Sequence, residues 1–199
     1  MKWLAEPWDK HFAAERLTLL DQTYTALGRD QELLELRRSN YQKNPDHWHL
    51  KALLDVLPEQ ERAAMQDQAV ANALTLGRVE SRIDTLLALN AVKAAEQQLI
   101  THYSRARVFY GSLLNWASTF QQAQRFLAVV VCHRLLLEDI LAGARSRVYH
   151  HAADYYRQLD KLDGEIEDYA PLTHWREYQQ QVRQQHGRKL SFWQRLSTL

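Results

Sequence analysis

Cysteine, proline and glycine are scarce in this chain of 199 residues, which has one cysteine, four prolines and six glycines. A single cysteine cannot form an intramolecular disulfide, and such usage is typical of a reducing compartment. With so few glycines and prolines there is no room for many tight hairpin turns. These absences favour a helical protein of the cytoplasm.

An excess of one charge and a long hydrophobic run are also lacking. Lys and Arg together number 25 against 24 Asp and Glu, so no global field selects nucleic acid or an anionic membrane, and either partner would need a local patch. The longest nearly uncharged stretch, residues 126–137, is too short to cross a bilayer. The first ten residues hold no apolar stretch of signal-peptide length. We therefore expect a cytoplasmic location and no membrane partner.

Leu, Ala, Gln, Glu and Arg are abundant, and apolar residues recur at spacings of three and four along nearly the whole chain. Turn residues divide this pattern into segments of helix length, and sustained alternation of period two is absent. The expected helices span residues 8–27, 31–42, 46–57, 58–76, 79–89, 91–103, 106–120, 124–142, 145–162 and 172–185, followed by a tail over 186–199.

The sequence thus predicts an all-α fold of stacked antiparallel helical hairpins. We expect one domain over residues 1–199, within which residues 1–104 would form repeat-like hairpins and residues 105–199 a carboxyl-terminal helical cap. The segment 124–142 is the most apolar in the chain, so we expect it at the centre of the core.

One repeat unit is legible near the amino terminus. It has large residues on its first helix, a glycine at the turn and a proline seventeen positions later: Leu17, Leu20, Tyr24, Leu27, Gly28, Leu33, Tyr41 and Pro45. This unit resembles a tetratricopeptide repeat, and residues 83–99, with Asn90 in the turn, form a weaker echo. The resemblance implies a right-handed α-solenoid closed by the long apolar helix.

Two further segments carry a second resemblance. They are residues 144–156 and the ending His186-Gly187-Arg188-Lys189-Leu190-Ser191-Phe192-Trp193. Both are similar to an uncharacterised family of bacterial helical proteins that end in a His-Gly-Arg-Lys…Phe-Trp tail. Members of that family are often longer, so the resemblance implies that this chain corresponds to their carboxyl-terminal half. It implies a bacterial cytoplasmic helical-repeat protein and brings no catalytic residue with it.

No motif predicts catalysis, a cofactor or a metal. The adjacent His150 and His151 would point about 100° apart on a helix and could not easily bind one ion. The acidic stretch at residues 165–168 is typical of a solvated loop, and Cys132 lies in an apolar run that predicts a buried thiol. We therefore expect a protein that is not an enzyme.

The carboxyl-terminal tail is the first candidate contact surface. Arg188 and Lys189 lie close to Phe192 and Trp193, with no acidic residue between 183 and 199, a pattern that can bind phosphates and stack a base. The competing interpretation is that both aromatic rings dock on the preceding helices, while the cations reach water or pair with the acidic loop. We favour docking, because aromatic side chains more often anchor a chain end than display themselves.

Arg145 and Arg147 are the second candidate surface. Cations at the start of a helix oppose the helix dipole, so they should have an anionic partner, either a nearby carboxylate or a ligand. Trp3 and Trp8 predict a contact with another subunit or with upstream sequence, or else an amino-terminal cap.

The leading functional hypothesis is a non-enzymatic interaction or scaffolding module that presents a groove between hairpins to a protein or peptide, as helical solenoids do. The alternative is nucleic-acid binding through the basic aromatic tail, which a steep salt dependence would reveal. A third possibility, a hydrolytic enzyme, would need a pocket of converging acids and histidines that the sequence does not show.

Overall fold

The computed structural model describes residues 9–103 and 108–197, and all regular secondary structure within these ranges is helical. The predicted all-α fold class is confirmed. Trp3 and Trp8, and the contact predicted for them, lie outside the described residues. No helix in the described part of the chain combines the length and apolar character that crossing a bilayer requires.

The first of two compact units extends to Asn72. It contains α1 (Asp9–Ala26), α2 (Asp30–Lys43), α3 (His47–Val56) and most of α4 (Glu59–Leu74). The helix α2 packs against both α1 and α3, and its core side chains include the buried Leu33 and Tyr41. Asp46 caps α3 by accepting a hydrogen bond from the His49 backbone N–H, which satisfies one of the unpaired donors at a helix start. This unit therefore contains the predicted repeat segment.

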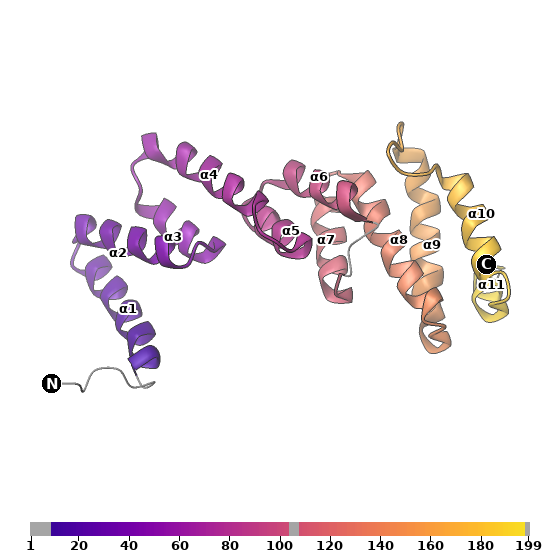
Figure 1. Cartoon of the computed structure of the whole chain (residues 1–199), viewed down its shortest axis with the longest axis horizontal. Helices are drawn as coiled ribbons and strands as arrows, with labels where there is room; N and C mark the ends of the chain where they lie inside the picture. The colour runs from indigo at the N-terminus through magenta and orange to yellow at the C-terminus, as the bar shows by residue number, and fades with distance from the viewer. Residues whose placement is uncertain (1–8, 104–107, 198–199) are drawn as a thin grey trace. The chain divides into compact units, whose positions relative to one another are not determined.

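The second unit runs from Ala73 and contains the remaining helices. They are α5 (Val79–Ala88), α6 (Val92–His102), α7 (Tyr110–Gln122), α8 (Phe126–Ala142), α9 (Tyr149–Leu162), α10 (Trp175–His186) and α11 (Leu190–Ser197). The α5 helix packs against α6 and α7, α7 packs against α8, and α8 packs against α9, as in stacked hairpins. The last helix, α11, packs on α9 (Figure 1).

The apolar helix α8 is the centre of the second unit. It contacts α6, α7 and α9, and most of its seventeen residues are buried. Cys132 is fully buried within it, and burial raises the pKa of its thiol. The predicted central helix and the predicted buried thiol are both confirmed.

Four turns in the described ranges share one backbone motif. Gly28, Asn90, Gln124 and Ala144 have φ values of 63°, 57°, 55° and 49°. In each turn the backbone N–H of the left-handed residue donates to the carbonyl three residues before it. The N–H of the next residue donates to the carbonyl five residues before that residue, as Arg29 does to Tyr24. These paired bonds form the Schellman motif that ends helices. The predicted turns at Gly28 and Asn90 are thereby confirmed.

The largest differences between the observed and the expected helices concern α7, α9 and the tail, and α10 begins at Trp175 where a start at residue 172 was expected. The helix expected from residue 106 begins at Tyr110, and the one expected from Arg145 begins at Tyr149 after a short 3-10 turn, η2 (Ser146–Val148). The tail, which was expected to follow the last helix, contains α11 because one side of it packs on α9.

The division into compact units falls between Asn72 and Ala73. The sequence-based expectation of one domain with a sub-division near residue 104 stays a prediction.

Candidate functional site

A groove of about 610 Å³ runs between α7 and α9 along α8. We call it the α7–α8–α9 groove. One face of each helix lines it, at the spacing of three or four that keeps side chains on one side of a helix. The principal lining residues are Leu114, Ala117, Ser118 and Gln121 of α7, Phe126, Val129 and His133 of α8, and Asp154, Tyr155, Gln158 and Lys161 of α9.

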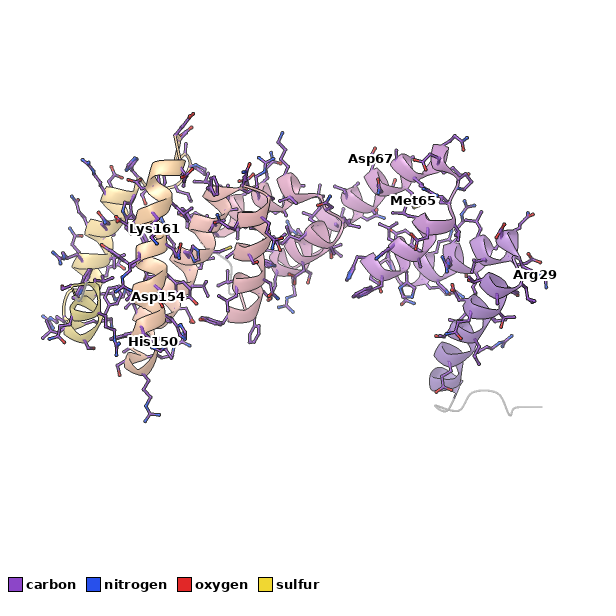
Figure 2. All side chains as sticks on the ribbon, turned by 180° about the vertical axis from the view of Figure 1, so that it is seen from behind. Arg29, Met65, Asp67, His150, Asp154 and Lys161 are labelled. Carbon is purple, nitrogen blue, oxygen red and sulfur yellow. The ribbon has the colours of Figure 1, made fainter. Side chains whose placement is uncertain are left out.

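The groove has an apolar floor and a polar rim. Phe126 and Val129 form the floor on α8, and Leu114 on α7 is 39% exposed beside it. On α9, Asp154 and Lys161 lie along the same side of the helix, as Figure 2 shows. The accessible apolar surface comes from Leu114 and the half-buried Phe126, because Val129 is only 1% exposed.

His133 is the unusual residue of the groove. Its Nδ1 atom is buried without a hydrogen-bond partner, and burial lowers the pKa of the imidazole to about 4. The other ring nitrogen, Nε2, is not buried in this way, so it is the atom that can meet the groove. A neutral imidazole carries its proton on either nitrogen, so His133 can present Nε2 to a bound molecule as a donor or as an acceptor.

A pair of tyrosines links the two walls of the groove. The hydroxyls of Tyr110, at the start of α7, and Tyr155, on α9, are 2.5 Å apart. Burial and this hydrogen bond raise the pKa of Tyr155, so its hydroxyl stays protonated at neutral pH. The bond fixes the spacing of the walls at this point.

The charges on the rim are mixed in sign. Asp154 is paired with Arg157 at 3.0 Å, whereas Lys161 and Glu165 make no ion pair with any described residue. A rim with one unpaired cation and one unpaired anion does not favour a polyanion, since neither sign dominates. Such a rim is complementary to a partner surface that carries both acidic and basic side chains.

The predicted aromatic tail is docked on the helical body. Phe192 is fully buried, and its ring makes edge contacts with Tyr149 and Tyr156 at 6.1 and 6.0 Å between centroids. Trp193 donates its indole N–H to the carbonyl of His186 at 3.0 Å, and the Arg183 guanidinium lies over its ring. These contacts agree with the docking interpretation. They leave no face of the Phe192 ring free to stack on a base.

The four predicted cations have different surroundings. Arg188 is exposed and Lys189 half-buried, and neither makes an ion pair with a residue that the structure describes. Arg145 is bonded to the Asp139 carboxylate and donates to the Asp139 carbonyl at 2.7 Å, so it has the nearby carboxylate that its position called for. Arg147 is exposed on η2. The expectation that both arginines open an α-helix is wrong, because η2 precedes α9.

One protein family matches this chain. The model of DUF6880, described as a family of unknown function, matches residues 6–195. The chain belongs to DUF6880. No curated protein and no solved structure matches it. Membership of a helical family of unknown function, predicted from the ending of the chain, is confirmed, whereas the bacterial origin stays a prediction.

The histidines of this DUF6880 chain are distributed over different contacts. His150 and His151 have ring centroids 4.0 Å apart, and His186 lies 3.1 Å from the Glu138 carboxylate. Within residues 9–103 and 108–197 no group of three His, Cys, Asp or Glu side chains is placed to hold a metal ion.

Sequence analysis of the DUF6880 chain missed the α7–α8–α9 groove. No residue of the stretch 126–137 was predicted to line a binding site, although the spacing of His133 from Phe126 and Val129 places all three on one face of α8. That spacing was the available signal. Which helices flank this face depends on tertiary packing, and periodicity alone does not give it.

Proposed function

We propose that this protein is a non-enzymatic interaction module that binds an amphipathic helix of a partner protein in the α7–α8–α9 groove. The observation that carries the proposal is the groove itself, in which three helices each turn one continuous face toward the same space of about 610 Å³. A helix is the natural occupant, because helix faces with residues three and four apart pack ridges into grooves.

The dimensions support a helical occupant. From Leu114 to Gln121 the wall on α7 rises roughly 10 Å, which is about two helical turns. An occupant of that length presents three or four apolar side chains at positions i, i+3, i+4 and i+7. These would lie against Phe126, Val129 and Leu114, and the polar positions between them would face the rim.

The polar groups of the groove support selectivity. The Nε2 atom of His133 suits a hydrogen-bonding partner, such as a side-chain amide or carboxylate of the bound helix. Lys161 and Glu165 are placed to attract one acidic and one basic residue on its outer face. The proposed ligand is therefore an amphipathic helix with mixed charge and not a strongly basic one.

A peptide selection tests this proposal directly. Phage-displayed sixteen-residue peptides are selected on the full chain, and the enriched peptides are measured by fluorescence anisotropy. We expect enrichment of sequences with apolar residues at helical spacing and without internal proline. Leu114→Asp should weaken their binding about tenfold or more, as loss of a central apolar contact does.

Leu190→Asp is the matched control for that experiment. Leu190 is 69% exposed on α11, outside the groove, so the same chemical change there should leave the affinity within about twofold. Equal losses in the two variants, or enrichment of peptides without helical periodicity, would contradict the proposal.

Nucleic-acid binding by the carboxyl-terminal helices is the second candidate. Five cations, Arg176, Arg183, Arg188, Lys189 and Arg195, make no ion pair with any described residue, and this observation favours it. The test is the affinity for a single-stranded oligonucleotide between 50 and 200 mM salt. A drop of about tenfold or more over that range, abolished by Arg188→Glu with Lys189→Glu, would support this candidate, and salt-independent or undetectable binding would dismiss it.

A further inference from the structure

A second groove, of about 600 Å³, lies within the first unit among α1, α2 and α3. We call it the α1–α2–α3 groove. Its lining includes Asp21 of α1, Arg37 and Asn40 of α2, Asn44 directly after α2, and Trp48 and Ala52 of α3. It shares no residue with the α7–α8–α9 groove, so a ligand bound here would be additional to the one proposed above.

Trp48 is the first notable feature of this groove. The side chain is 70% exposed, although tryptophan is a residue that folded proteins usually bury to a large extent. Its ring is flanked on one side by the His47 ring, with centroids 4.5 Å apart. The indole N–H makes no hydrogen bond to any residue that the structure describes. The groove therefore has an apolar ring face and a free donor on one side chain.

Asn40 and Asn44 are the second feature. Asn40 lies on α2 and Asn44 is the residue directly after this helix, and both line the groove. Within the described ranges neither side-chain amide makes a hydrogen bond. Each amide can give two hydrogen bonds and accept two, and together with Trp48 they place three unused donor groups in one groove.

The charges of the groove are already neutralised. Arg37 donates from Nε and Nη2 to the Asp21 carboxylate at 2.8 and 2.9 Å, and from Nη1 to the Ala52 carbonyl at 2.8 Å. The hydrogen bond to Asp21 raises the pKa of Arg37, so the guanidinium stays charged. A guanidinium so occupied does not attract an anion, and the site selects no net charge in its ligand.

We propose that the α1–α2–α3 groove binds an uncharged, proline-rich segment of a partner in the polyproline II conformation. Such a segment has no N–H at proline, and its carbonyls are not bonded internally, so it needs donors from its receptor. Trp48, Asn40 and Asn44 supply those donors. The apolar pyrrolidine rings can pack on the exposed indole face, as in other aromatic-lined grooves that bind proline-rich peptides.

The placement of the donors favours an extended ligand. Asn40 lies on α2, Asn44 directly follows that helix, and Trp48 lies on α3. A polyproline II segment has no internal hydrogen bonds, so its carbonyls can accept from these donors along its length, whereas a bound α-helix would offer free carbonyls only at its end.

Fluorescein-labelled decaproline is the probe for this inference, with a glycine–serine peptide of equal length as its control. Anisotropy is measured on the full chain. We expect saturable binding of decaproline and at least about tenfold weaker binding of the flexible control, which must lose more conformational freedom. Failure of decaproline to saturate, or equal binding of both peptides, would overturn the inference.

Variants locate the binding. Trp48→Ala should weaken decaproline binding about tenfold or more, and Trp48→Phe, which keeps a ring but lacks the N–H, should weaken it by a smaller factor. Asn40→Ala combined with Asn44→Ala should also weaken it. Leu27→Ala is the matched control, because Leu27 is 66% exposed and does not line the groove. Unchanged affinity in Trp48→Ala, shown by circular dichroism to be folded, would refute the site.

The two proposed ligands are distinguished by the same set of proteins. Leu114→Asp should leave decaproline binding unchanged, and Trp48→Ala should leave the binding of selected helical peptides unchanged. Loss of one activity without the other then shows which proposal has failed.

Discussion

The rings of His133 and Tyr155 are stacked across the packed pair α8 and α9, with centroids 5.5 Å apart and planes inclined by 25°. The stack holds the imidazole in one orientation, with Nδ1 inward and unpartnered. Because Tyr155 is also bonded to Tyr110, one chain of contacts joins all three helices of the groove. The position of the His133 ring is thereby fixed through Tyr155 on α9 and Tyr110 on α7.

Protonation of His133 should destabilise the fold. Burial lowers its pKa from 6.5 to about 4, so between these values the unfolded chain binds a proton and the folded one resists it. The stability that the neutral ring contributes is complete above pH 6.5 and is lost as the pH falls toward 4, with about 2 kcal/mol gone at pH 5.

Urea unfolding at pH 7.5 and pH 5 checks this expectation. The His133→Phe variant keeps a ring on Tyr155 and has no proton to bind, so between the two pH values it should lose about 2 kcal/mol less than the wild type. Identical losses would show that folding does not lower the pKa of His133.

Arg134 should tolerate methionine better than alanine. The guanidinium is buried, donates to the Thr173 hydroxyl and carbonyl at 3.2 and 2.8 Å, and lies 4.2 Å over the Tyr178 ring. Burial lowers its pKa, and no carboxylate among the described residues is paired with it. Arg134→Met keeps the volume and removes a desolvated charge, so we expect a loss of about 1 kcal/mol.

Arg134→Ala leaves a cavity as well as the unbonded Thr173 groups, and we expect a loss of about 3 kcal/mol. Chemical denaturation of both variants measures the difference. A methionine variant as unstable as the alanine variant would mean that the hydrogen bonds to Thr173, and not the packing, dominate.

Phe192 should matter to stability far more than the cations beside it. The ring is fully buried against Tyr149 and Tyr156, so Phe192→Ala should cost about 3–4 kcal/mol. Arg188→Glu with Lys189→Glu changes groups without ion pairs among the described residues and should stay within about 0.5 kcal/mol. A thermal unfolding series measures both, and a near-neutral Phe192→Ala would show that α11 is not docked in solution.

Ala144→Gly should stabilise the protein. Ala144 has a φ of 49°, where a Cβ is strained, and glycine relieves that strain at some entropic cost in the unfolded chain, for a net gain of about 0.5–1 kcal/mol. The reverse change, Gly28→Ala, introduces the same strain at φ 63° and should destabilise by about 1 kcal/mol. Denaturation midpoints give both signs, and destabilisation by Ala144→Gly would contradict this account.

Much of the helical architecture was predictable because it is local. Apolar spacing located every described α-helix except α11, and left-handed turns at Gly28 and Asn90 follow from the residue types that tolerate positive φ. Gln124 and Ala144 carry no such preference, so their turns are imposed by the packing of the flanking helices. The α9 helix starts at Tyr149 and not at Arg145, because residues 146–148 form the 3-10 turn η2.

The candidate sites were less predictable, for a different physical reason. The burial of Phe192 was foreseen because aromatic rings near a chain end tend to dock. The α7–α8–α9 groove joins Ser118 to Gln158, forty positions apart, and single-sequence periodicity does not say which two faces meet. Trp48 was not singled out, because its exposure depends on what its neighbours leave uncovered.

The four shared turns have an implication for how such chains can diverge. Each reversal is secured by bonds between main-chain atoms, and its left-handed position is filled by glycine, asparagine, glutamine or alanine. If a helix pair was duplicated in an ancestor, no shared residue type would therefore mark these turns. Related sequences should be aligned by the position of each turn and not by the amino acid that occupies it. Whole pairs could be gained or lost between two such turns while the remaining pairs keep their own closing bonds.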